Sequence, residues 1–438
     1  MTKITRRDAL IVGAGAVAGA SIGAPAWAQA APTWTIKPEK GASLRVLRPS
    51  KFVQGDETQW LANTKKYTDT TGVAVKVESE SWEDLRPKSA VAANVNKGPD
   101  IVYGWHDDAH QYPEKLVQVT DLANYLGAKY GGWYDACKKY SMKGNQWISI
   151  PLGAAGAKMV YRISWLKEAG FDKVPNDMPG FLKLCQALKA KGHPAGFALG
   201  NAVGDANGWC HWLVWSFGGK MVDDKNQVVI NSPETIAALE YAKQLYETFI
   251  PGTLSWNDSS NNKAFLDGQL GITNNGISVY YAAKNATDPT IKALAADIGH
   301  AEYPIGPIGK PTEVNLIVPA MIFKYSKFPN AAKDYIRFMM EKEQYEPWQD
   351  ASIGYFSQPL KAYENSKIWT VDPKHTPYRD TIKNMLWTGY SGAPGYASAA
   401  VLADYVMVNM VAQAASGAKS PKDAAAEAQK RAERYYKV

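Results

Sequence analysis

The sequence predicts an α/β protein with more than one domain, and three observations support this. The chain has 438 residues, which at roughly 100–200 residues per domain corresponds to two domains or more. From residue 43 onwards, segments with strand patterning alternate with amphipathic helical segments, an order typical of a parallel sheet covered by helices. Hydrophobic residues make up 46% of the chain and charged residues 21%, which suits folded cores and excludes a largely disordered or collagen-like chain.

The first strands and helices are predicted from residue 43 to residue 151. Strands are expected at 43–48, 73–77 and 100–103, an extended segment at 147–151, and helices at 57–69, 83–96 and 121–126. Ligands on parallel sheets bind beyond the carboxyl ends of the strands. The loops 49–56, 80–83 and 104–108 are therefore the first places to look for a binding site.

A second set of predicted strands and helices follows along the chain. Strands are expected at 158–163 and 196–200, and helices at 179–191, after Ser232, after Pro329, through the apolar stripe at 401–412, and at 421–436. Ser232-Pro233-Glu234 has the composition of a helix start, because serine caps the free N–H groups and proline tolerates the first turn. Gly192 and Gly417 are expected to end their helices.

The first 30 residues have the features of an export signal and are set aside from the fold. Arg6 and Arg7 precede an apolar stretch, residues 9–22, and Ala28-Gln29-Ala30 supplies a small-residue cleavage pattern. The apolar stretch is shorter than the roughly 20 residues that span a bilayer. The arginine pair resembles a twin-arginine signal, although the residues after it depart from that pattern, so general secretion stays open. We expect a periplasmic protein.

Charge and cysteine content exclude several classes. Lys plus Arg is 49 and Asp plus Glu is 42, a net charge of +7 that is too small and scattered to indicate nucleic-acid binding. The three cysteines, which are too few for a disulfide scaffold, are Cys137, Cys185 and Cys210. Cys185 shares a helical apolar stripe with Phe181, Leu184 and Leu188, so we expect a buried free thiol there. There is no Cys-x-x-Cys motif for zinc or redox chemistry.

Several short motifs then occur in a characteristic order. They are Thr71–Val75, Gly98–Val102, Ile148–Pro151, Leu166–Gly170, Ala264–Ile272 and Pro304–Gly309. In this order and spacing the chain resembles the extracellular solute-binding proteins of ABC importers, in the sugar-binding family that includes maltose-binding protein. It departs from the family at Arg162, where the family has Asn, and at the helix start Asp177–Gly180.

The resemblance implies two α/β lobes joined by crossover strands, with a ligand cleft between them that closes by a hinge motion. We expect lobe 1 to contain residues 42–150 and 303–355, and lobe 2 to contain residues 151–302 and 356–438. The expected ligand is a small carbohydrate and the expected partner is an ABC permease in the membrane. The protein is predicted to be a monomer, with no catalytic residues, cofactor, bound metal or nucleic-acid partner.

A sugar site needs aromatic rings for apolar C–H faces and planar polar groups for adjacent hydroxyls. His106-Asp107 matches a pair in the family, which implies Asp107 as a hydroxyl acceptor and Trp105 as a stacking platform. The full set of candidates consists of aromatic and polar residues in loops that follow strands or flank glycine-rich turns: Trp82, Glu83, Trp105, Asp107, Asn207, Trp209, Trp256, Asn275, Trp387 and Tyr390.

Two other classes remain open. A cation binder could use His106, Asp107, Asp108 and His110, although four ligands within five residues suit no common tetrahedral spacing. A polyamine between aromatic rings would be held by cation–π contacts. An exported carbohydrate-active enzyme could use paired acids, but neither Gly-x-Ser-x-Gly nor His-Glu-x-x-His occurs.

Overall fold

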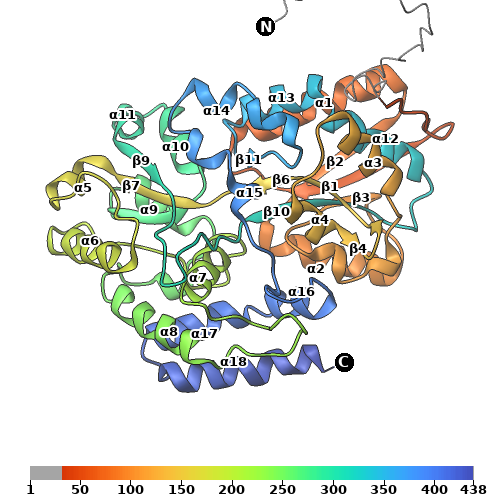
Figure 1. Ribbon diagram of the computed structural model, residues 1–438. Coiled ribbons are helices and arrows are strands. Elements are labelled where there is room, and N and C mark those ends of the chain that lie inside the picture. The colour runs from red at the N-terminus through yellow and green to blue at the C-terminus, as the bar shows by residue number, and fades with distance from the viewer. Residues whose placement is uncertain (1–31, 438) are drawn as a thin grey trace, which may run out of the picture.

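The computed structural model describes residues 32–437. These residues form two lobes, each built on its own β-sheet (Figure 1). The predicted export signal, residues 1–30, lies outside the described residues.

The first lobe contains a six-stranded mixed sheet with the order β11-β6-β10-β3-β1-β2. Its strands are β1 (Ser43–Pro49), β2 (Ala74–Glu80), β3 (Ile101–Tyr103), β6 (Ile150–Ala155), β10 (Leu316–Ile322) and β11 (Phe356–Ser357). Strand β1 lies parallel to β2 and β3, and Val46 pairs with Val77 on one side and Ile101 on the other. The predicted parallel order therefore holds for the first three strands, whereas β10 runs antiparallel to both β3 and β6.

Helices pack around this sheet, and local sequence sets their ends. They are α1 (Gln54–Thr71), α2 (Trp82–Val95), α3 (Thr120–Lys129), α4 (Asp135–Ser141), α12 (Pro329–Met340), α13 (Lys342–Ala351), α14 (Ile368–Val371) and α15 (Thr381–Asn384). Helix α1 ends at Gly72, whose φ of 73° lies in the left-handed region. Helix α2 begins after Ser81, whose hydroxyl accepts the N–H of Asp84 at 3.1 Å. A small hairpin, β4 (Met142–Lys143) and β5 (Gln146–Trp147), follows α4.

The second lobe contains a three-stranded antiparallel sheet with the order β8-β7-β9. Its strands are β7 (Lys158–Arg162), β8 (Ile272–Asn275) and β9 (Ile298–Ala301), and its helices before the C-terminal segment are α5 (Ile163–Glu168), α6 (Met178–Ala190), α7 (Asp205–Ser216), α8 (Pro233–Tyr246), α9 (Ser260–Leu266), α10 (Ser278–Lys284) and α11 (Pro289–Asp297). Ser232 caps α8, as predicted. Cys137, Cys185 and Cys210 are all buried free thiols.

The strand predicted at 196–200 is wrong. Only Ala195 forms β-bridges, to Phe249 and Ile272. Leu199 then donates to the carbonyl of Thr253, which lies in the 3-10 helix η3 (Thr253–Ser255). Because the neighbouring chain is helical there, the ladder stops after one residue.

The chain crosses between the lobes three times, and the first and the last of these crossings lie later in the sequence than predicted. Strand β6 continues through Ala155 in the first sheet, so the first crossover lies at 156–157 rather than at 150. Strand β11 adds to the edge of the same sheet. Residues 360–385 then bury Tyr363, Trp369 and Tyr378 in the first hydrophobic core. The second core takes over near Val401, because the edge strand and these rings hold the intervening segment on lobe 1.

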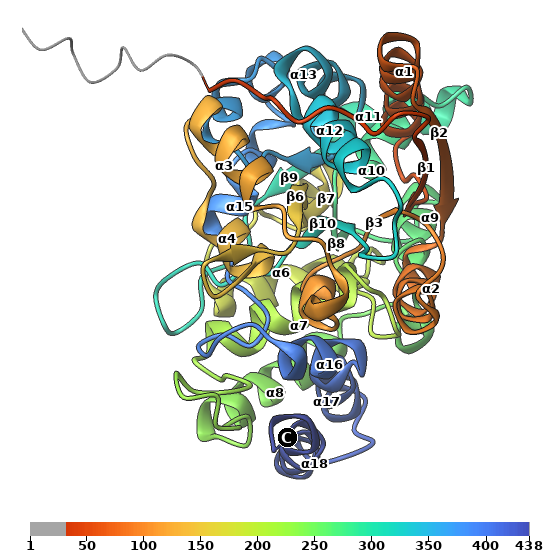
Figure 2. The ribbon, with the colours of Figure 1, turned by 90° about the vertical axis from the view of Figure 1, so that its right-hand side faces the viewer.

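Three C-terminal helices complete the second lobe: α16 (Tyr396–Ala403), α17 (Val406–Ala415) and α18 (Pro421–Tyr436). They lie together beside α7 and α8 (Figures 1 and 2). The single helix predicted through 401–412 is broken at Tyr405, whose φ is 51°. The stretch Tyr396–Ala415 is apolar and long enough to cross a membrane, but more than half of it is buried inside the protein.

Candidate ligand-binding site

The turn after β3 places polar side chains of lobe 1 at the contact with lobe 2. His106 donates its backbone N–H to the carbonyl of Ile317 at 2.8 Å, which fixes the turn against β10. The φ of His106 is 50°, a conformation that non-glycine residues rarely adopt and that often marks functional sites. Asp107 and Asp108 follow and are fully buried.

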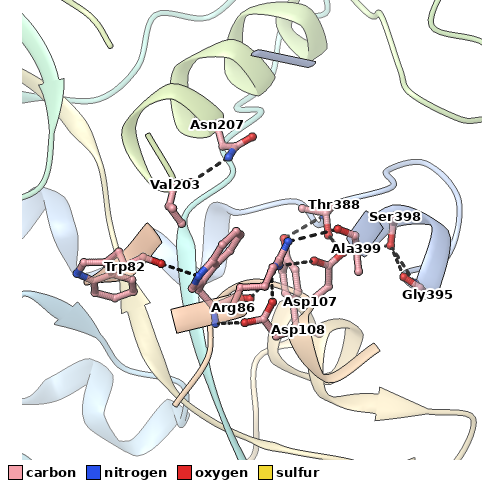
Figure 3. A network of polar contacts seen from close by, with 12 residues as sticks. Trp82, Arg86, Asp107, Asp108, Val203, Asn207, Thr388, Gly395, Ser398 and Ala399 are labelled. Atoms are coloured by element: carbon pink, nitrogen blue, oxygen red, sulfur yellow. Dashed lines mark hydrogen bonds and ion pairs between the residues drawn. The ribbon is translucent and has the colours of Figure 1, made fainter. Parts of the chain in front are cut away.

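Arg86 on α2 neutralises this pair of acids. Its Nε donates to Asp108, a terminal nitrogen lies 3.5 Å from Oδ1 of Asp107, and the guanidinium stacks 3.5 Å from the centre of the Trp105 ring. Asp108 also accepts the backbone N–H of Trp105 at 2.9 Å. Burial raises the pKa of Asp108 to about 6, against the opposing effect of Arg86. Figure 3 shows Arg86 lying between the two acids.

Asp107 also connects the turn to the C-terminal segment. Its Oδ2 accepts the hydroxyls of Thr388 at 2.6 Å and Ser398 at 3.1 Å (Figure 3). Its Oδ1 has no hydrogen-bond partner within the described chain. One carboxylate oxygen therefore accepts two hydrogen bonds from the protein, whereas the other has only the ion-pair contact with Arg86 at 3.5 Å.

Further buried polar atoms near this turn have no hydrogen-bond partner among residues 32–437. They are both ring nitrogens of His106, Oδ1 of Asn207, Nε1 of Trp215 and the hydroxyl of Tyr436. Asn207, Trp215 and Tyr436 line one small space together with Thr388 and Ser398. Buried polar groups are nearly always hydrogen-bonded, so this concentration of unpaired groups indicates a place for polar ligand atoms.

Burial also keeps the histidines of this region neutral. It lowers the pKa of His106 to about 3, with Arg86 adding to the effect. It lowers the pKa of His211 to about 4, and the Nδ1 of His211 contacts the carbonyl of Asn207 at 2.8 Å. A neutral imidazole offers one donor and one acceptor, so His106 can contact a hydroxyl in either direction.

A second space lies between the lobes, at the N-terminus of helix α7. It is a cavity of about 40 Å³ whose lining includes Phe52 and Tyr355 from lobe 1 and Asp205, Asp258 and Asn275 from lobe 2.

Helix α7 and the loop before α9 position the acids of this cavity. Asp258 accepts the N–H groups of Gly204 at 3.1 Å and Asp205 at 2.8 Å, and so caps α7. Asp205 accepts the amide of Asn261 at 2.9 Å. Burial raises the pKa of Asp258 to about 6, and burial together with the charge of Asp258 raises that of Asp205 well above its usual value.

Five of the candidate residues lie at or near this contact between the lobes. Trp82 stacks on Phe52 with ring centres 6.4 Å apart. Asp107, Asn207 and Asn275 are buried next to the spaces described above. Glu83 is exposed, and its charge helps to raise the pKa of Asp258 across the interface.

The other candidates lie elsewhere, and the position of Trp209 is a correction. Its side chain is 0% exposed in the core of lobe 2, where Nε1 donates to the carbonyl of Ala198 at 2.6 Å. Trp105 has one face covered by Arg86 and donates to the carbonyl of Trp82, so it supports the site from behind. Trp256 packs against Gly196 instead of lining the cavity. Each of these three indole rings packs against residues of its own lobe.

Trp387 and Tyr390 belong to a loop on the outside of the site. Trp387 lines a groove of about 970 Å³ beside Lys138 and Lys139, and the ammonium of Lys139 lies 4.8 Å from its ring centre. Tyr390 contacts the Trp387 ring edge-on and also packs against Trp215.

Several residues of the site were missed by the sequence reasoning. Phe52 lies in the loop 49–56, so the rule that ligands sit after parallel strands was sufficient to find it. Asp258 follows Trp256 by two residues, but only the tryptophan is among the candidate ligand-binding residues. Asp205, Tyr355 and Tyr436 carry no local signal, because distant parts of the chain bring them to the contact between the lobes.

The described residues offer no support for a metal site. Among residues 32–437, no group of three or more His, Cys, Asp or Glu side chains is placed to hold a metal ion. His110 instead contacts the carbonyl of Lys139 through Nε2 at 3.2 Å, and Asp108 is paired with Arg86.

Comparison with known proteins identifies the class. Residues 62–377 match the family described as bacterial extracellular solute-binding protein, and the chain belongs to this family. A probable ABC transporter-binding protein from Deinococcus radiodurans is 25% identical over 230 residues, which are 50% of this chain and 54% of that protein. The match thus spans about half the length of that relative.

Solved structures share the two-lobed fold. A solute-binding protein from Thermotoga lettingae bound with α-D-tagatose has a TM-score of 0.77 at 16% identity, covering 90% of this chain and 100% of that chain. Maltose-bound MalE3 of T. maritima has a TM-score of 0.77 at 17% identity with the same coverage. A ribitol complex from Agrobacterium radiobacter has a TM-score of 0.72 at 20% identity, covering 91% and 100%. The predicted two-lobed α/β architecture is confirmed.

Proposed function

We propose that this protein binds a carbohydrate between its two lobes in the periplasm and delivers it to the permease of an ABC importer. The observation that carries the proposal is the group of buried, unpaired polar atoms on His106, Asp107, Asn207, Trp215 and Tyr436. They supply acceptors and donors within one region, which is what a ring of hydroxyl groups requires. The tagatose, maltose and ribitol bound by the structural relatives support the same class of ligand.

The rest of the proposal concerns how the protein works. The N-terminal pattern of residues 1–30 supports export, by a twin-arginine-like or general secretion route. The protein acts as a monomer that closes on its ligand, and the closed form is recognised by the permease. Catalysis is not part of the proposal, because Asp107 and Asp108 are already engaged by Arg86, Thr388 and Ser398.

A ligand screen tests this proposal. Thermal shift followed by titration calorimetry is carried out with tagatose, maltose, laminaribiose, ribitol, common hexoses and hexosamines, with spermidine and calcium as non-sugar probes. We expect saturable binding of at least one carbohydrate without its conversion. A response to spermidine or calcium alone would overturn the proposal.

Variants then place the ligand in the site. Asn207→Ala and Asp107→Ala should weaken binding of the carbohydrate found in the screen, by about 1–3 kcal/mol for a lost buried hydrogen bond. Asn63→Ala is the matched control, because Asn63 is also a buried helical amide but donates to the carbonyl of Gln344 at 3.0 Å, far from the site. Equal affinities for Asn207→Ala, Asp107→Ala and Asn63→Ala would remove Asn207 and Asp107 from the site.

A further inference from the structure

We propose that the carbohydrate taken up by this protein carries an ammonium group, which binds between Asp205 and Asp258 next to the rings of Phe52 and Tyr355. This inference rests on the proposed function and specifies its substrate as an amino sugar with a free amine. It follows from the charges, the rings and the unpaired hydroxyl that line the cavity between the lobes.

The charges of this cavity are not balanced by side chains. Asp205 and Asp258 both line it, and within the described chain no lysine, arginine or histidine does. Asp258 is partly compensated by the N-terminus of α7, which it caps. Asp205 accepts a single neutral amide, from Asn261. Two adjacent buried carboxylates without a cation repel each other, so either a shared proton or a bound cation must offset them.

The adjoining crossover segments do not supply the missing cation. Lys158 is buried there and is paired with two acids, Glu302 at 2.5 Å and Glu313 at 3.1 Å. Tyr303 is close enough to Asp205, Glu302 and Glu313 for all three to raise its pKa, after burial itself. The wider surroundings of the cavity therefore also contain more carboxylates than cations.

The lobe 1 side of the cavity favours an organic cation over a metal ion. Phe52 lies between two other rings, with centres 6.5 Å from Tyr355 and 6.4 Å from Trp82. Aromatic faces attract ammonium groups and pack against apolar C–H surface, whereas residues 32–437 contain no group of three or more His, Cys, Asp or Glu side chains placed to hold a metal ion.

The hydroxyl of Tyr355 is a second and independent sign of a ligand. Its side chain lines the cavity and is only 8% exposed, yet the hydroxyl has no hydrogen-bond partner among residues 32–437. An ammonium carries three donors, which match the two carboxylates and this oxygen. A sugar ring is larger than the present cavity of about 40 Å³, so the lobes must separate by their hinge to admit it.

Titration calorimetry at pH 7 with matched sugars tests the inference. Glucosamine and galactosamine are each compared with the parent hexose and with the N-acetyl derivative, which lacks the charge. We expect at least one free amine to bind about tenfold tighter or more than both matched neutral sugars, equivalent to ~1.4 kcal/mol. Asp205→Asn should reduce this preference to about threefold or less, while Asp177→Asn, which changes an exposed carboxylate capping α6, should leave it unchanged.

Each outcome decides a different claim. Neutral sugars that bind as tightly as the amines would overturn the amino-sugar inference and leave the proposed carbohydrate function intact. Binding of putrescine or spermidine with no response to any sugar would overturn both. The comparison among sugars uses the wild-type protein, so it remains decisive even if Asp205→Asn does not fold, which circular dichroism will report.

Discussion

Two pairs of buried carboxylates lie at the contact between the lobes, and they differ in what surrounds them. Asp107 and Asp108 on lobe 1 are held by the guanidinium of Arg86. Asp205 and Asp258 on lobe 2 line a cavity with no cationic side chain among its described residues. Burial raises the pKa of Asp108 and of Asp258 to about 6. The difference shows that burial alone does not define the role of a carboxylate pair, because the role also depends on whether a cationic side chain neutralises the pair.

The neutralised pair acts mainly as a connection within the protein. Through Asp107 it reaches Thr388 and Ser398, and through Arg86 it reaches the carbonyl of Ala399 at 3.3 Å. These contacts fix the C-terminal segment against lobe 1. The unbalanced pair has fewer internal partners and faces the space between the lobes, so its charge is available to a ligand.

The largest effect is expected from removing the cation of the first pair. Arg86→Gln should lower the free energy of unfolding by about 3–5 kcal/mol, because it leaves buried carboxylates without a partner. The matched control is Arg45→Gln, which breaks the exposed pair with Glu78 and should cost about 0–1 kcal/mol. Urea denaturation measures both, and similar losses in the two variants would contradict the role given to Arg86.

A pH effect of intermediate size is expected from the second pair. Asp258 has a pKa raised to about 6 in the folded protein, above its value in the unfolded chain. The folded state therefore binds this proton more tightly, and the unfavourable contribution of Asp258 is relieved as the pH falls from above 6 towards about 4. Relative to Asp258→Asn, the wild type should gain about 1–3 kcal/mol of stability across that window.

A carboxyl group whose pKa is shifted in the opposite direction provides the control for this prediction. Asp297 has a lowered pKa, because hydrogen bonds from Ser164 and Arg162 outweigh the effect of burial. Relative to Asp297→Asn, the wild type should lose stability as the pH falls through that group. The pKa values of His106 and His211, lowered to about 3 and 4, also make the folded protein lose stability as the pH falls below about 6.5. They are common to all three proteins, so differences between the unfolding curves cancel them.

The smallest effect is expected at the hydroxyl contacts of Asp107. Thr388→Val removes one neutral donor and leaves Ser398 and Arg86 in place, so it should cost about 1 kcal/mol. Thr370→Val changes an exposed hydroxyl that donates to the carbonyl of Lys367 and should be close to neutral. A loss above about 3 kcal/mol for Thr388→Val would show that the hydroxyl, and not Arg86, holds the segment to lobe 1.

Local patterns predicted most of the elements, and the errors share a cause. The alternation in 43–103, the cap at Ser232 and the last helix at 421–436 were all found from neighbouring residues. The segment 196–200 resembles a strand but has a 3-10 helix beside it. A strand is defined by its neighbour as well as by its own pattern, which a single segment cannot reveal.

The candidate site was predicted in outline and corrected in detail. Loops after strands led to Asp107 and to the region of Phe52, because the edge of a parallel sheet follows from the order of the elements. Residue type alone could not decide which tryptophan faces the ligand. Trp209 and Trp105 have the right chemistry, yet the core of lobe 2 and the guanidinium of Arg86 cover them.

The amino-acid order by itself determined the α/β class, most helix ends and the membership of the solute-binding family, since each depends on short-range spacing, capping or motif succession. Only the tertiary structure decided which acids are neutralised and which are left facing the interlobe space. Charge balance depends on distances between residues separated in the chain, such as Arg86 and Asp108 in lobe 1 or Asp205 and Asp258 in lobe 2, and those distances exist only once each lobe has folded.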